Sequence, residues 1–274
     1  MSMHTTRPPT DSREPTGAAG HLTSPIAGSS SADLERPVPI PFDVNAMARM
    51  LVIATVAVIF MGIVSRVASG VKTDFPFRDL IVPMFALGSE ANIPSVFSGV
   101  ILSVAAIVAW VIARGKRQQG DHFQRHWMGV SYVFVYLAID EVAQIHDRAT
   151  TGVRNILGDS AIFHYAWVVP YFFVVVGVIV WSIPFLRHLP RRTAGGMMLA
   201  GAMYVMGAMG LEVIEGALEY LGLFHSVAMP VLVTIEESLE MFSVVLFIWL
   251  LLDYLRSYLS NLHLDLSFIG GRTR

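Results

Sequence analysis

Six long apolar runs, separated by short polar stretches, dominate the chain after its first 43 residues. Each run is close to the ~20 residues that a helix needs to cross ~30 Å of hydrocarbon. All five tryptophans lie at or near the ends of these runs, as the aromatic belts of membrane proteins do. The pattern therefore predicts an all-α fold, a polytopic transmembrane helix bundle of about six spans. The expected spans are Met47–Val67, Val96–Ala113, Trp127–Ile145, Trp167–Phe185, Gly195–Leu221 and Met229–Leu252.

The two ends of the chain lack such a run. Residues 1–43 are rich in Pro, Ser, Thr and Gly, a composition that buries too little surface to offset its ordering entropy. We therefore expect a disordered N-terminal tail over 1–43, a six-span domain over 44–258 and a short cytoplasmic tail over 259–274. The first apolar run begins too late and is too long for a signal peptide.

Composition supports a membrane location and narrows the chemistry. Only 15% of the residues are charged, 54% are hydrophobic and the mean hydropathy is +0.58, whereas a soluble domain usually has about 25% charged residues. Lipid is therefore the expected partner, and a net charge of -2 without a basic stripe gives no support for nucleic-acid binding. Because the chain has no cysteine, any metal would need carboxylate, imidazole or water ligands.

Basic residues favour one side of the expected membrane. By the positive-inside rule this side faces the cytoplasm, so both termini are expected to be cytoplasmic. The basic residues of this side lie between the second and third spans, between the fourth and fifth spans and near the termini: Arg49, Arg114, Lys116, Arg117, Arg125, Arg187, Arg191, Arg192, Arg256, Arg272 and Arg274.

Carboxylates interrupt three of the apolar spans. With ~1.5 Å of rise per residue, most of these acids fall on the outer side of the midpoint of their helices, in one common layer. In the fifth span the spacing i, i+3, i+7 places three of them on one face. On the third span Asp140, Gln144 and Asp147 would form a similar stripe. The acids are Asp140 and Glu141 in the third span, Glu212, Glu215 and Glu219 in the fifth, and Glu236, Glu237 and Glu240 in the sixth.

Such acids need a compensating partner inside a bilayer. One ionised carboxylate near a helix centre costs ~2.5–3.5 kcal/mol, so eight would cost on the order of 20 kcal/mol if all were charged and faced lipid. No Lys or Arg lies inside these three spans. Protonation, a water-filled cavity or a bound cation could each compensate.

Histidine favours a bound cation. His146 lies five residues after Glu141, and a cluster of carboxylates with an imidazole is typical of iron, manganese or zinc sites without thiolates. The chain lacks the Glu-x-x-His motif of di-iron bundles. We predict a divalent metal site with the candidate ligands Asp140, Glu141, His146, Glu212, Glu215, Glu236, Glu237 and Glu240.

Three functions remain open from these residues. A metal site opening outward could serve oxidative or hydrolytic chemistry on a lipid-soluble substrate. The same acids could bind and release an ion or a proton in a coupled carrier, which would need a polar route to the cytoplasm. A scaffold or assembly factor could use the acids only as a hydrogen-bond network, and Glu219, His164 and His225 could be solvated residues of the outer interface.

Three stretches carry a resemblance to known proteins: EANIPSVFS at Glu90–Ser98, LAIDEVAQIHD at Leu137–Asp147, and EESLEM at Glu236–Met241. With the six-span layout, they make residues 45–258 resemble a set of uncharacterised bacterial multi-pass inner-membrane proteins. The resemblance implies a location in the bacterial inner membrane and no particular chemistry. It also draws attention to Glu90 and Asn92, which precede the second span on its outer side.

Overall fold

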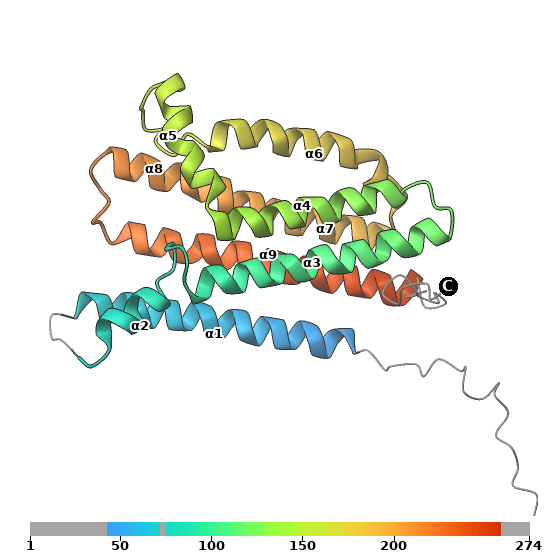
Figure 1. Ribbon diagram of the computed structural model, residues 1–274, viewed down its shortest axis with the longest axis horizontal. Helices are drawn as coiled ribbons and strands as arrows, with labels where there is room; N and C mark the ends of the chain where they lie inside the picture. Colours follow the sequence, from blue (N-terminus) through green and yellow to red (C-terminus); the bar gives the residue numbers. More distant parts are fainter. Residues whose placement is uncertain (1–42, 72–74, 259–274) are drawn as a thin grey trace, which may run out of the picture. The chain divides into compact units, whose positions relative to one another are not determined.

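The computed structural model describes residues 43–71 and 75–258, and these form helices and turns with no strand among them (Figure 1). The expected tails over 1–43 and 259–274 lie outside the described residues, except for Asp43. The elements are α1 (Val44–Gly70), α2 (Arg78–Met84), α3 (Ile93–Gln118), α4 (Gln124–Ala143), α5 (Ile145–Leu157), α6 (Val168–His188), α7 (Arg191–Val205), the π-helix η2 (Met206–Leu211), α8 (Glu212–Tyr220) and α9 (Ala228–Tyr258).

The all-α, multi-span architecture is confirmed. Five helical segments are long and apolar enough to cross a membrane: α1, α3, α6, α9 and the run from α7 through η2 to α8. A sixth span is possible if α4 and α5, which meet at an angle of 79°, are counted as one broken span. Each expected span overlaps one of these segments, and the fourth and fifth expected spans extend one residue beyond it, at Trp167 and Leu221. The third and the fifth are not regular helices throughout.

The third span breaks at Gln144. This residue has φ 55° and ψ 44°, the left-handed conformation, and it ends α4 and begins α5. A left-handed residue cannot continue a right-handed helix, so the chain turns sharply there. The predicted stripe of Asp140, Gln144 and Asp147 assumed one continuous helix, and it is wrong because Asp147 belongs to the turned helix α5.

Helix α9 is the central element of the bundle. It packs against α1, α3, α7 and η2, and α3 packs along α4. Figure 1 shows α1 and α6 on opposite sides of these inner helices. Most of α6 is exposed, as expected for an apolar helix that faces lipid. Close packing inside the bundle, rather than exclusion of water, has to hold such helices together in a bilayer.

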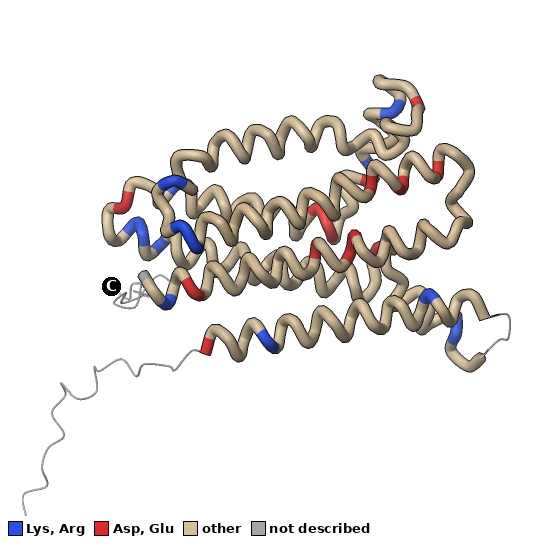
Figure 2. The backbone as a smooth tube through the Cα atoms, turned by 180° about the vertical axis from the view of Figure 1, so that it is seen from behind, with Lys and Arg blue, Asp and Glu red and all other residues tan. Residues whose placement is uncertain are grey.

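The two ends of the bundle differ in charge. Figure 2 shows most Lys and Arg residues at the end where α3 joins α4, and most Asp and Glu residues in the opposite half. We call these the basic end and the acidic end. A dense apolar cluster fills the basic end, formed by Ala109, Ile112, Ala113, Trp127, Phe185, Leu189, Met197, Leu250, Leu251 and Tyr254.

The π-helix η2 lies directly before the acids of the fifth span and packs closely against α9. A Cβ atom at Gly207 would lie 3.0 Å from Cγ of Glu240 and 3.1 Å from the backbone oxygen of Glu236. Glycine is therefore needed for this close approach. Short π-helical segments inside α-helices are frequent at functional sites.

We predict that Gly207→Ala lowers the unfolding free energy by about 1–3 kcal/mol, because the added methyl group must push η2 away from α9. The matched change Gly201→Ala lies one turn and a half earlier in the same span, where a Cβ atom meets nothing within 4 Å. It should leave stability unchanged or raise it by up to about 1 kcal/mol. Equilibrium unfolding in detergent micelles measures both, and equal effects of the two variants would contradict the close contact.

Candidate metal centre

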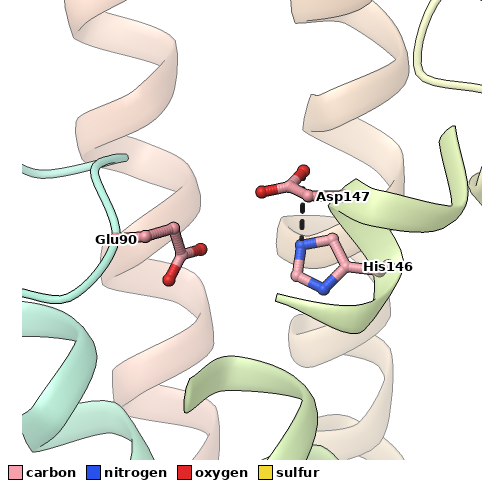
Figure 3. Close-up of side chains that lie close together, drawn as sticks. All are labelled: Glu90, His146 and Asp147. Carbon is pink, nitrogen blue, oxygen red and sulfur yellow. Dashed lines mark ion pairs between the residues drawn. The ribbon is translucent and has the colours of Figure 1, made fainter. Parts of the chain in front are cut away.

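Three side chains with metal-ligand chemistry converge at the acidic end. One ligand atom from each of Glu90, His146 and Asp147 lies within 4.8 Å of the others (Figure 3). Glu90 lies in the connection between α2 and α3, whereas His146 and Asp147 lie in the first turn of α5. Two chain segments that are far apart in sequence therefore build one cluster of an imidazole and two carboxylates.

The connection before α3 is fixed by a bond to α9. The backbone N–H of Gly88 donates to Oε1 of Glu237 at 2.8 Å. Gly88 has φ +68°, and a Cβ atom there would lie 2.6 Å from Cγ1 of Val233, so both the backbone conformation and the space require glycine. Glu237, predicted as a ligand, thus holds the segment that carries Glu90.

The start of α3 fixes the other side of Glu90. Asn92 and Ser95 form a capping box, in which each side chain bonds the backbone N–H of the other residue. The side-chain amide of Asn92 also donates to the backbone oxygen of Ala86 at 2.6 Å. Ala91, between the cap and Glu90, has φ 57°, an uncommon conformation for a residue with a side chain.

The position of His146 depends on Asp140. One oxygen of Asp140 accepts from the backbone N–H of His146 at 3.1 Å, and the other lies 2.9 Å from its ring Nδ1. Because a carboxylate can only accept, Nδ1 is the donor. Nε2 is then directed away from Asp140, 3.8 Å from Oδ1 of Asp147. Metal-binding histidines commonly donate their second ring N–H to a carboxylate in this way.

Asp140 is buried, and its oxygens are occupied by hydrogen bonds. Besides the two bonds from His146, it accepts a bond from the hydroxyl of Tyr171 at 3.1 Å. Asp140 was predicted as a ligand, and the structure places it behind the histidine instead of within the cluster of three. In this position Asp140 can hold the ring of His146 in a fixed orientation.

Glu90 lies outside the expected spans, and its surroundings disfavour its charged form. Burial raises its pKa, and the nearby charge of Asp147 adds to this effect, while His146 opposes it. Its Oε2 atom is buried and has no hydrogen-bond partner among the described residues. A bound cation would supply that partner and would stabilise the charged carboxylate.

The other predicted ligands lie near this cluster without joining it. Glu212 accepts from Nε1 of Trp167 at 3.1 Å. Glu219, which was not among the predicted ligands, accepts from the hydroxyl of Tyr165. Glu240 is close enough to interact electrostatically with Glu237, Glu141 and Glu212. Within residues 43–71 and 75–258, no three of the predicted ligands meet the 4.8 Å distance that Glu90, His146 and Asp147 meet.

Glu215 and Glu236 form a second feature of the acidic end. Glu215 lies on α8 and Glu236 on α9, and the two carboxyl groups are within electrostatic reach of each other. Glu215 is only 6% exposed, its Oε1 atom has no partner among the described residues, and Arg66 of α1 lies near enough to act on its charge. Two ionised carboxylates repel each other, so a proton or a bound cation would stabilise this pair.

The sequence prediction contained one of the three clustered residues. His146 was a candidate ligand, whereas Asp147 was placed on a helix stripe that the break at Gln144 removes. Glu90 was singled out only through the resemblance at Glu90–Ser98. Asp147 directly follows His146 in the chain, and this adjacency could have identified the aspartate as a candidate ligand.

We predict that Ala91→Gly raises the unfolding free energy by about 1 kcal/mol, because glycine adopts the left-handed conformation without the steric cost of a Cβ atom. The exposed helical residue Ala202 is the matched control, since glycine there should lower stability by about 1 kcal/mol. Chemical unfolding of both variants measures the difference. A loss of stability in Ala91→Gly equal to that in the control would contradict the conformation at residue 91.

Comparison with known proteins gives a family for most of the chain. Residues 49–255 match the family model described as "Domain of unknown function (DUF8692)". No curated protein and no solved structure matches the chain.

Proposed function

The chain belongs to the DUF8692 family, and we propose that it is an integral membrane protein that binds a divalent metal ion between Glu90, His146 and Asp147. The observation that carries the proposal is the convergence of these three side chains within 4.8 Å, with His146 oriented by Asp140. One imidazole and two carboxylates suit iron, manganese or zinc.

The charge distribution supports a proposal for the location and orientation of the protein. By the positive-inside rule, the basic end faces the cytoplasm and the acidic end faces the outside. Together with the resemblance at Glu90–Ser98, this favours a bacterial inner membrane with both termini in the cytoplasm. The metal centre would then lie near the outer surface of the bilayer, where the break at Gln144 turns α5 away from the bundle.

The basic end supports a closed site over a carrier. A carrier needs a polar route that continues from the acids to the other side of the membrane. The basic end is instead filled by the apolar cluster that includes Trp127, Phe185 and Leu251, all of which are at most 1% exposed. The acids lie in the opposite half (Figure 2). This arrangement supports a site that opens only outward or sideways.

The proposed chemistry is hydrolytic or oxidative and acts on a lipid-soluble substrate. A bound ion with three protein ligands keeps coordination positions for water or substrate, and it lowers the pKa of bound water. Other residues of the chain would support the bound ion. Asp140 holds the imidazole of His146, Glu237 holds the segment that carries Glu90, and the remaining acids can accept and release protons nearby.

We predict that gently purified protein contains about one iron, manganese or zinc ion per chain by elemental analysis, since three ligands define one site. His146→Gln should remove the metal, because glutamine offers no imidazole nitrogen. The control His225→Gln, a histidine in the connection between α8 and α9, should retain it. Metal that survives His146→Gln but disappears in Glu215→Gln/Glu240→Gln would place the ion among the other acids and refute the centre proposed here.

A second prediction concerns Asp140→Asn. Asparagine keeps the shape of the side chain, but its amide can donate to Nδ1 of His146, which then leaves the proton on Nε2. We expect the metal affinity to fall by about 10–100-fold while the protein stays folded. Competition titration with a fluorescent zinc chelator measures the affinity. An affinity equal to that of the unmodified protein would show that Asp140 does not orient the histidine.

A further inference from the structure

Helix α5 lies crosswise at the acidic end of the bundle. It meets α4 at an angle of 79°, and Figure 1 shows it at the end of the long helices. Helix α4 has 20 residues, so by itself it reaches ~30 Å, the thickness of the hydrocarbon layer. When α4 crosses the bilayer, a helix at 79° to it runs nearly parallel to the membrane plane. The third span is therefore complete without α5, which is left at the outer surface.

Two sides of α5 have an evident environment. At ~100° per residue, the buried Thr150 and the partly buried His146 fall on one side, which faces the bundle. Asp147, Thr151 and Asn155 fall on a second side, and all three are exposed. This second side is polar throughout and suits contact with water.

The third side of α5 is apolar and exposed. Ile145 and Ile156 are about three helical turns apart and therefore lie on the same side of the helix. They are 38% and 83% exposed, respectively. A helix with one apolar and one polar side, placed parallel to the membrane at the end of a span, is typical of interfacial helices, whose apolar side enters the boundary between head groups and acyl chains.

Arg148 lies at the border between the polar and the apolar side of α5. Its side chain is exposed, and it forms no ion pair or hydrogen bond within residues 43–71 and 75–258. A long cationic side chain beside an apolar surface lays its methylene groups on that surface and extends its charged end to the interface. The layer of lipid phosphates at the interface supplies the negative charge that this guanidinium lacks in the protein.

We propose that α5 is an interfacial helix that binds the phospholipids of the outer leaflet, with Ile145 and Ile156 among the upper acyl chains and Arg148 on a lipid phosphate. The bend at Gln144 favours lipid over a second copy of the chain, because a helix held at 79° to a spanning helix already meets the leaflet. This binding needs no metal ion. Since the first turn of α5 carries two of the proposed metal ligands, the helix also sets the depth of the metal centre at the lipid head groups, and this consequence alone rests on the proposed function.

The test uses full-length protein in nanodiscs of phosphatidylethanolamine and phosphatidylglycerol. Because the chain has no cysteine, one introduced cysteine carries the only nitroxide spin label. Power saturation compares the accessibility of the label to oxygen, which concentrates in lipid, with its accessibility to a water-soluble nickel chelate. The label of Ile156→Cys should be reached mainly by oxygen, like the reference Ile179→Cys on the exposed surface of α6. The label of Thr151→Cys should be reached mainly by the chelate, like the reference Gln119→Cys at the end of α3.

A second set of variants tests the phosphate contact. Arg148→Gln should lower the ratio of oxygen to chelate accessibility at position 156, because the helix loses its charged contact with the head groups. Arg148→Lys should keep the ratio, since it keeps the charge. Arg117→Gln, which removes an exposed arginine at the basic end, should also leave the ratio unchanged.

Three outcomes would overturn the proposal. Chelate access at both 151 and 156 would place α5 in water, oxygen access at both would make it the second half of a broken span, and protection of 156 from both reagents would indicate a covering second copy. An unchanged ratio in Arg148→Gln would refute the phosphate contact. Elemental analysis of the same samples separates this inference from the metal centre. The expected depths in protein without metal would refute the metal centre alone, whereas bound metal with other depths would refute the interfacial helix alone.

Discussion

The carboxylate of Asp140 holds His146 by two contacts, one to the backbone N–H and one to the ring. The backbone contact matters because it lies across the break at Gln144, where the helical hydrogen bonds of α4 stop. An aspartate in the last turn of α4 thus accepts from the first turn of α5 and fixes the direction of the turned helix. The placement of His146 and Asp147 beside Glu90 and the link to Tyr171 both depend on this one side chain.

Three irregular backbone positions lie directly beside the clustered acids and histidine. The left-handed Gln144 precedes His146, the left-handed Ala91 follows Glu90, and the π-helix η2 precedes Glu212. Within a bilayer, such departures are tolerated where protein, rather than lipid, surrounds the backbone. Each departure also costs free energy, so the surrounding contacts must over-determine it. Gly88, bonded to Glu237, and Gly207, packed on α9, supply such contacts.

The spans could be predicted from the sequence because a bilayer imposes a simple requirement, ~20 apolar residues for each helix. The cluster of Glu90, His146 and Asp147 could not be predicted from the sequence, because its geometry comes from contacts between distant parts of the chain. The hydrogen bond from Gly88 to Glu237 joins residues that are 149 positions apart, and no local sequence pattern predicts it. The turn at Gln144 was missed for a related reason: glutamine is an ordinary helix residue, and only its tertiary surroundings hold it in the left-handed conformation.

The carboxylates of the acidic end would repel one another if all were ionised. Glu215 of α8 and Glu236 of α9 lie within electrostatic reach of each other, and two ionised carboxylates have no proton to share. Arg66 is a single cation near Glu215, whereas Glu141, Glu237 and Glu240 also lie within electrostatic reach of one another. Protons or bound cations would relieve this repulsion. The apolar bundle thus gathers its carboxylates in one half (Figure 2), beside an imidazole that Asp140 holds in place, and this arrangement is what the proposed metal centre would use.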